Sequence, residues 1–177
     1  MVDKVILVTR DDCEVGIATK LKVHQEGLLH RAFSIFVTRE GSQGLEILLQ
    51  KRHRQKYHSG GLWSNTCCGH PRPGETTQDA AQRRLLEEMG LAMSLQEIGS
   101  FHYEARLGNG LVENEIDHVF VGKLGDQPFT ANLQEVEEHA WVPIIAVSQD
   151  CQDHPEKFTA WFKPALQVLH DLGDIYD

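Results

Sequence analysis

The segment from Gly69 to Leu91 constrains the fold most, because a turn-rich loop runs directly into a helix of defined length. The loop, GHPRPGE, holds two prolines and two glycines, which are typical of turns. The stretch TTQDAAQRRLLEEMGL then repeats apolar residues at helical spacing, namely Ala81, Leu85, Leu86 and Met89. Gly90 follows them as a typical helix stop, so a loop followed by one helix is predicted.

Two strand pairs are predicted on either side of this segment. The first pair consists of the strand-like runs RAFSIFVTRE and LEILLQKRH, joined across the turn Gly41–Gly44. The second pair consists of FHYEARL and LVENEIDHVFVGKL, joined across Gly108–Gly110. FTAWFKPALQVLHDL predicts a closing helix with Phe162, Leu166 and Leu169 on one face. Because strands and helices are mixed without regular alternation, the predicted class is α/β (α+β) around a mixed sheet.

Length and charge set the broad class of the protein. The chain has 177 residues and neither repeats nor linker-like stretches, so one domain over residues 1–177 is expected. A net charge of −9 argues against nucleic acid or an anionic membrane as a partner. The N-terminal apolar run, Val5–Val8, is too short for a signal peptide, and no run approaches a membrane span. We therefore expect a cytoplasmic protein with reduced cysteines.

The stretch VENEID holds carboxylates that a strand would align. The strand period of two places Glu113, Glu115 and Asp117 on one face. Such a face can be merely solvated, or it can hold a metal ion. Three histidines close to predicted turns or strand ends, His24, His30 and His70, favour the second interpretation. Imidazoles together with carboxylates suit Zn²⁺, Mn²⁺ or Fe²⁺ better than Mg²⁺. The sequence leaves open whether these side chains meet.

The stretch SNTCCGHPRPGE carries the reactive side chains Cys67, Cys68 and His70. They could be metal ligands, a nucleophile with its base, a disulfide or simply buried residues. The chain has no CxxC pair, which argues against a zinc finger or ribbon. Adjacent residues in extended backbone point in opposite directions, so only one of the two cysteines can face a bound molecule.

The spacing Gly69-x5-Glu75-x7-Arg83-Arg84-Leu85-Leu86-Glu87-Glu88-Met89-Gly90-Leu91 resembles the Nudix box, by which that superfamily binds a divalent cation on a diphosphate. One position departs, because Arg84 stands where the hydrolases carry a glutamate. Together with NTCCGHP, LLHRAFSIF, ENEID and a tryptophan near the C-terminus, the chain resembles the type I isopentenyl-diphosphate isomerases from about Lys20 to Trp161. This resemblance implies the Nudix α/β/α sandwich around a mixed sheet.

The resemblance also implies two metal sites and a set of functional residues. One Zn²⁺ or Mn²⁺ would be bound by His24, His30, His70, Glu113 and Glu115. Mg²⁺ would be bound with the substrate diphosphate by Glu88 and the backbone carbonyl of Cys68. Cys68 and Glu115 would form the acid–base pair, with Tyr103 beside them. The implied substrate-binding residues are Lys20, Arg52, Lys56, Arg84 and Trp161. For Arg83 and Glu87 we expect only exposed helix salt bridges. For Lys51 and Arg54 we expect an exposed strand end.

The predicted activity is therefore interconversion of isopentenyl and dimethylallyl diphosphate in isoprenoid biosynthesis, by a monomer or homodimer. Two alternatives stay open. A Nudix pyrophosphohydrolase would need the carboxylate that Arg84 replaces, and would leave three histidines and Cys68 without a role. A non-catalytic metal- or diphosphate-binding module would not need a thiol beside the metal.

Overall fold

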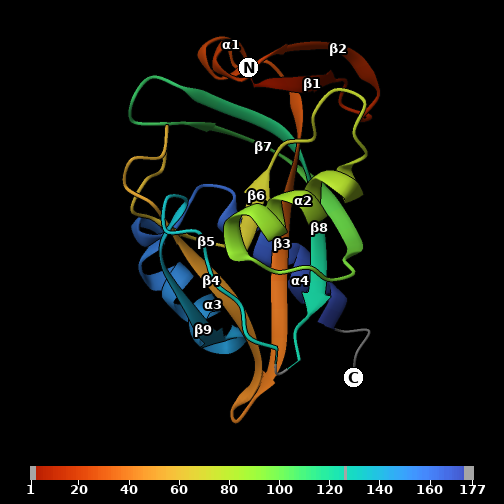
Figure 1. Ribbon diagram of the computed structural model, residues 1–177. Helices are drawn as coiled ribbons and strands as arrows, with labels where there is room; N and C mark the ends of the chain where they lie inside the picture. The colour runs from red at the N-terminus through yellow and green to blue at the C-terminus, as the bar shows by residue number, and fades with distance from the viewer. Residues whose placement is uncertain (1–2, 126, 174–177) are drawn as a thin grey trace.

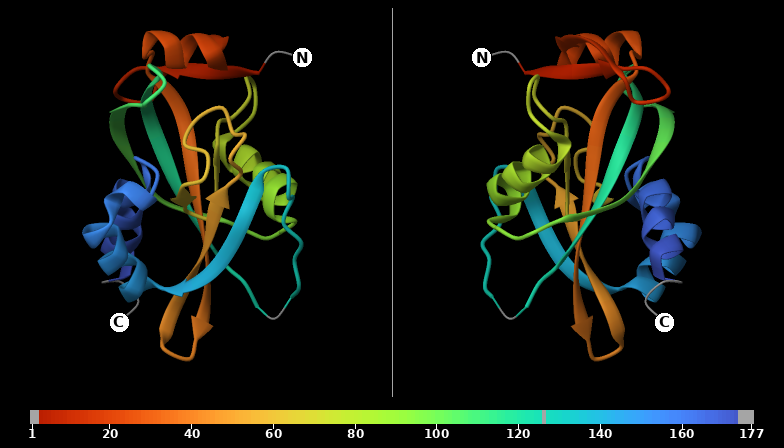
Figure 2. Two further views of the ribbon diagram at one scale, coloured as in Figure 1. Left: turned by 90° about the vertical axis from the view of Figure 1, so that its left-hand side faces the viewer. Right: turned by 90° about the vertical axis from the view of Figure 1, so that its right-hand side faces the viewer.

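The computed structural model describes residues 3–125 and 127–173, which form a large mixed β-sheet with helices on both faces (Figures 1 and 2). In chain order the elements are β1 (Lys4–Val8), β2 (Glu14–Thr19), α1 (Lys20–Glu26), β3 (His30–Gly41), β4 (Gly44–Arg52), β5 (Trp63–Ser64), β6 (Cys67–Gly69), α2 (Thr77–Met89), β7 (Gln96–Arg106), β8 (Val112–Lys123), β9 (Val136–Pro143), α3 (Ile144–Asp153), the 3₁₀ turn η1 (Pro155–Lys157) and α4 (Phe162–Gly173). Residues 1–2, 126 and 174–177 of the predicted single domain lie outside the described residues.

Strand β3 is the centre of the sheet. It pairs in parallel with β8 from His30 opposite Glu115 to Thr38 opposite Lys123, and antiparallel with β1, β4 and β6. Strand β7 pairs antiparallel with β8, and β9 pairs antiparallel with β4. The two predicted strand pairs, β3 with β4 and β7 with β8, are therefore confirmed, and the fold is of the mixed α/β class.

The alternation of β3 side chains builds two cores on the two faces of the sheet. Phe33, Ile35 and Val37 lie in one core with residues of α2, whereas Phe36 lies in the other with residues of α3 and α4. Figure 2 shows α2 on one side of the sheet and α3 and α4 on the other. The predicted α/β/α sandwich is thus confirmed, and the phenylalanine-rich strand is buried on both faces.

Helix α2 begins and ends where the sequence predicts. The side chain of Thr76 accepts a hydrogen bond from the Asp79 backbone N–H, and Gly90 ends the helix with φ of 66°. Leu86 is an exception to the predicted apolar face, because it is 54% exposed. Its position in the helix falls beside the charged face, away from the core. Of the helices in the described ranges, none is long and apolar enough to span a membrane.

Helix α4 is shorter than the predicted closing helix. It starts at Phe162, so that Pro164, which has no backbone N–H to donate, lies in its first turn. Phe162, Leu166 and Leu169 all face the core beneath it, as predicted. The preceding residues lie against the sheet instead, where Phe158 forms a bridge with Trp63.

An N-terminal unit of β1, β2 and α1 was not predicted, and it covers one end of the sheet (top of Figure 1). Ile6 and Val8 of β1 pack on Ile116 of β8. Thr19 caps α1 through a hydrogen bond from the Lys22 N–H, and Gly27 ends the helix in the left-handed region. This short helix carries Lys20 and His24 toward the ends of β3 and β8.

We predict that Gly90→Ala destabilises the protein by at least about 2 kcal/mol. Alanine is strained at a positive φ, and a Cβ at this position would lie 2.5 Å from the backbone oxygen of Thr130. Gly74, with φ of 82° and open space around it, is the matched control, and Gly74→Ala should cost only about 1 kcal/mol. Urea unfolding of both variants measures the difference. Equal losses would show that the contact with Thr130 is unimportant.

Candidate active site and metal centre

A cavity of about 240 Å³ gathers most of the predicted functional side chains. Its lining includes residues of every predicted kind: acid–base residues, metal ligands, cations for the diphosphate and the C-terminal tryptophan. These residues are Lys20, Arg52, Lys56, Cys68, His70, Arg84, Glu88, Tyr103, Glu113, Glu115 and Trp161. His24 and His30 are fully buried behind this lining.

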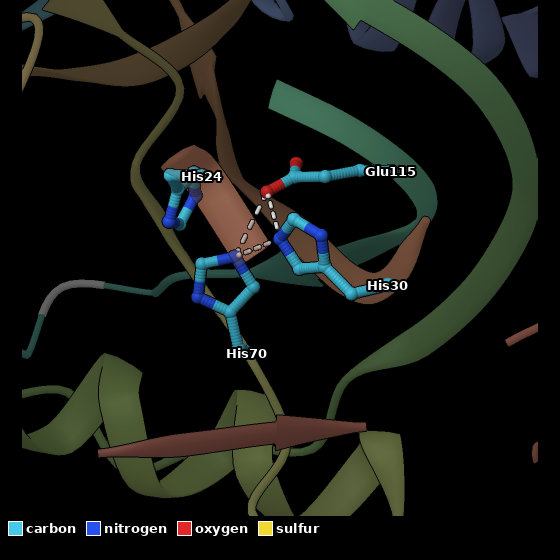
Figure 3. A group of neighbouring side chains, drawn as sticks. All are labelled: His24, His30, His70 and Glu115. Carbon is cyan, nitrogen blue, oxygen red and sulfur yellow. Dashed lines mark hydrogen bonds and ion pairs between the residues drawn. The ribbon is translucent and has the colours of Figure 1, made fainter. Parts of the chain in front are cut away.

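Three side chains from different elements converge on one point (Figure 3). Nε2 of His30 lies 3.2 Å from Nε2 of His70, and these atoms lie 3.1 Å and 2.8 Å from Oε1 of Glu115. The parallel register places His30 directly opposite Glu115, and the loop after β6 supplies His70. Ligand atoms held about 2.1 Å from one ion lie roughly 3 Å apart, which is the spacing found here.

The ring orientations of His24 and His30 leave one nitrogen of each free for a ligand. Nδ1 of His24 lies 2.7 Å from the backbone oxygen of Lys20, and Nδ1 of His30 lies 2.8 Å from that of Leu28. A carbonyl oxygen can only accept, so each Nδ1 donates and each Nε2 carries a lone pair. Nε2 of His24 is buried without a hydrogen-bond partner, and a ring nitrogen of His24 lies within 4.8 Å of the ligand atoms of His30, His70 and Glu115. These donors fit a divalent metal ion.

Glu113 lies beside this cluster rather than in it. The hydroxyl of Tyr103 lies 2.9 Å from Glu113 and 2.5 Å from Glu115, and so bridges the two carboxyl groups. On its other side, Glu113 lies 3.3 Å from Nε2 of His58. His58, Glu113 and His24 form a second, overlapping group of possible ligands. Sequence reasoning missed His58, although it stands in a basic segment directly before the Ser59-Gly60-Gly61 turn.

The pKa values of Glu113 and Glu115 are shifted in opposite directions. Burial and the neighbouring charge of Glu115 raise the pKa of Glu113 well above its ordinary value. Burial acts the same way on Glu115, but its contacts with the His30 and His70 rings outweigh burial and hold that pKa well below the ordinary value. The two pKa shifts are thus opposite in direction, and Glu113 is the carboxyl group of the pair that holds a proton more readily.

The aligned carboxylates of β8 are not a solvated face. Glu113, Glu115 and Asp117 are all nearly fully buried and line the cavity. Oδ2 of Asp117 accepts a hydrogen bond of 2.8 Å from the hydroxyl of Ser34. The opposite face of β8 carries Ile116, which packs on the N-terminal unit. The strand period thus separates the face of β8 that lines the cavity from the face that packs on the N-terminal unit.

The adjacent cysteines of β6 point in opposite directions. Cys67 is buried in the core beneath α2, whereas Cys68 lines the cavity. Nη1 of Arg52 lies 3.5 Å from Sγ of Cys68. Burial raises the pKa of Cys68 to about 11, and the charge of Arg52 offsets this only in part. Cys68 is therefore a thiol at neutral pH rather than a group that titrates near neutrality.

Basic residues gather on the other side of the cavity. Four cations reach it: Lys20 from α1, Arg52 from β4, Lys56 from the loop after β4 and Arg84 from α2. Burial, together with the charges of Arg52 and Lys56, lowers the pKa of Lys20. Like charges held this close repel one another, so the arrangement favours a bound anion of high charge.

Glu88 lies among these cations. Its Oε1 contacts Lys56 at 3.2 Å and also contacts Arg84, and its Oε2 accepts a hydrogen bond from Gln50. Burial opposes ionisation, but the charges of Lys56 and Arg84 lower the pKa of Glu88. It is thus a buried, ionised oxygen donor in the same cavity as Cys68, which fits the oxygen ligands that Mg²⁺ prefers.

Trp161 is both a core anchor and part of the cavity wall. Its ring is 3% exposed, and Nε1 donates a hydrogen bond of 3.1 Å to the side chain of Asn65. The guanidinium of Arg52 lies over the ring, 5.2 Å from its centre.

Lys51, Arg54 and Arg83 form ion pairs, as the sequence predicts for Arg83. Lys51 and Arg54 both pair with Glu137, outside the cavity. Arg83 pairs with Glu75 and Glu87, although it also reaches the cavity wall.

Comparison with known proteins identifies the family. Residues 28–162 match the NUDIX domain. The chain is 49% identical to isopentenyl-diphosphate Delta-isomerase of Serratia proteamaculans, an alignment that covers 98% of this chain and 93% of that protein. It is 46% identical to the enzyme of the same name from Burkholderia multivorans, covering 96% and 97% of the two chains.

Solved structures bear on the fold alone. The crystal structure of DR0079 from Deinococcus radiodurans superposes with a TM-score of 0.75 at 16% identity, over 93% of this chain and 98% of that one. The MutT protein from Methanosarcina mazei Go1 gives a TM-score of 0.65 at 19% identity, over 82% and 95% of the two chains. The family model and the full-length sequence matches show that the chain belongs to the NUDIX family and, within it, to the isopentenyl-diphosphate Delta-isomerases.

Proposed function

We propose that this protein interconverts isopentenyl and dimethylallyl diphosphate, with Cys68 and Glu115 as its acid–base pair. One observation supports this most directly: a thiol, a carboxylate beside imidazoles, and a cluster of cations all line a single cavity. The family membership supports the same reaction. Moving the double bond requires a proton added at one carbon and another removed two carbons away, through a tertiary carbocation.

The two acid–base residues reach the substrate from different directions. Strand β6, which carries Cys68, and strand β8, which carries Glu115, pair with opposite edges of β3. Two groups so placed can act on two faces of a bound alkene. Oε1 of Glu115 contacts the imidazoles, and Oε2 lies beside the Tyr103 hydroxyl. Oε2 is therefore the oxygen that exchanges one proton with the substrate. The Cys68 thiol exchanges the other proton.

His24, His30, His70 and Glu115 would hold one Zn²⁺ or Mn²⁺, with Glu113 as the fifth ligand that the family resemblance implies. Such an ion would supply Lewis acidity that fixes the Glu115 carboxylate and tunes its acidity. The cations bind the diphosphate, and Glu88 with the carbonyl of Cys68 would hold Mg²⁺ on it. Trp161 and the buried wall exclude water, which would otherwise capture the carbocation.

The first prediction concerns the reaction. Incubated with isopentenyl diphosphate and Mg²⁺ in D₂O, the protein should form dimethylallyl diphosphate that carries deuterium, because both proton transfers use groups that exchange with solvent. Proton and phosphorus NMR follow the product. Release of phosphate or pyrophosphate without the allylic isomer would instead indicate the hydrolase.

The second prediction concerns the transition metal. His70→Ala should weaken its binding by more than the roughly 10–100-fold typical of an outer-shell residue, because a direct donor is lost. His154, an exposed residue beside Glu156, provides the control His154→Ala, which should retain the metal. Elemental analysis after desalting gives the stoichiometry. Full metal content in the His70 variant would remove this residue from the ligand set.

The third prediction separates the two cysteines. Cys68→Ala should lower kcat by about 10²- to 10⁴-fold or more, since a proton-transfer group is removed, while the fold and metal content stay intact. Cys67→Ala should cost about 1 kcal/mol of stability and leave turnover near normal, because Cys67 only fills the core. Steady-state kinetics and thermal unfolding of both variants test this. Normal turnover by the Cys68 variant would refute the acid–base assignment.

A further inference from the structure

Glu135, which directly precedes β9, lines the cavity beside the basic residues and takes no part in the proposed proton transfers. We infer that Glu135 is a displaceable counter-ion: it holds Lys56 and Arg84 while the site is free and yields them to the substrate diphosphate. This inference rests on the proposed function, and it adds a residue that sets the selectivity of the site for diphosphates.

The ion pairs show how Glu135 competes for the site. Lys56 contacts Glu88 at 3.2 Å and also forms an ion pair with Glu135. Arg84 contacts Glu88 and lies 3.7 Å from Oε1 of Glu135; it also pairs at 2.7 Å with Glu87, which does not line the cavity. Within the cavity, each of these two cations therefore lies between the same two carboxylates, Glu88 and Glu135. An incoming diphosphate meets cations that are already neutralised, so it binds them only if one carboxylate leaves.

The burial of the two carboxylates decides which one leaves. The side chain of Glu135 is 31% exposed, whereas that of Glu88 is 2% exposed and is also held by Gln50. Moving a carboxylate into water is easy for a side chain that already touches water and costly for one enclosed in protein. Glu135 therefore turns outward, while Glu88 stays as the fixed oxygen donor.

The backbone around Glu135 does not need to move. Its backbone oxygen accepts a hydrogen bond of 3.0 Å from the His53 N–H, and its own N–H donates to Asn132 at 2.9 Å. The Asn132 N–H in turn donates to the backbone oxygen of Glu88 at 2.8 Å. The exchange thus involves only rotation of the Glu135 side chain on a fixed loop.

Such an exchange discriminates between anions. A diphosphate has the charge and the number of oxygens to replace Glu135 on both cations, whereas a monophosphate replaces it less completely. The carboxylate therefore lowers the affinity for every anion, and lowers it most for those of small charge. Removing its charge should raise affinity and reduce selectivity.

The chain offers a matched control in Glu137. This residue lies two positions further along, and it too pairs with a lysine and an arginine, Lys51 and Arg54. It does not line the cavity. A non-specific effect of lost negative charge would therefore appear equally in Glu135→Gln and Glu137→Gln.

The experiment is calorimetric binding of isopentyl diphosphate and isopentyl monophosphate, saturated analogues that cannot isomerise, to the metal-loaded protein with and without Mg²⁺. Without Mg²⁺, Glu135→Gln should bind the diphosphate about tenfold more tightly, and the monophosphate should gain more. Glu135→Ala should act in the same direction, and Glu137→Gln should stay within about twofold of the unsubstituted protein.

Three outcomes would overturn the inference. Unchanged or weaker binding by both Glu135 variants would show that no exchange takes place. Weakening confined to solutions that contain Mg²⁺ would make Glu135 a metal ligand instead. If the unsubstituted protein bound neither analogue under any condition, the diphosphate site itself would be wrong, and the inference would fail with it.

Discussion

The site depends on the parallel pairing of β3 with β8. This register sets His30 opposite Glu115 and, through the alternation of both strands, sends Phe33 and Phe120 into the core beneath α2. A slip of β8 by one residue would turn Glu113 and Glu115 away from the imidazoles and would move Phe120 out of the core beneath α2. The hydrophobic effect that fixes the core therefore also fixes the geometry of the ligands, because one register determines both.

Charge is sorted across the cavity of this acidic protein. Carboxyl groups and imidazoles occupy the β8 side, and the cations Lys20, Arg52, Lys56 and Arg84 occupy the side near α2. Both sides are buried enough that neither would be stable without partners. The cations lower the pKa of Glu88 on their side, whereas burial and the charge of Glu115 raise the pKa of Glu113 on the other. Arg84, where the hydrolases of the superfamily carry a glutamate, contributes to the cationic side.

Sequence reasoning succeeded where a pattern is local. The period of β8 predicted its carboxylate face, and the turn and stop signals predicted the two strand pairs and helix α2. It missed α1, because seven residues give too short an apolar repeat. It also missed His58, whose importance comes from contact with Glu113, 55 positions away. Glu135 was missed because its contact with Lys56 depends on tertiary packing.

Helix α1 links two binding events through a single turn. The ring of His24 donates a hydrogen bond to the backbone oxygen of Lys20, one turn earlier, while the Lys20 side chain reaches the cavity. Any ligand that fixes the His24 ring also restricts this turn, and any anion that fixes Lys20 restricts the ring. Thermodynamic linkage makes such an effect reciprocal: whatever factor metal occupancy adds to anion affinity, the anion adds to metal affinity. The order in which the metal ion and the anion bind then changes the path to the complex that contains both, but not the total free energy of binding.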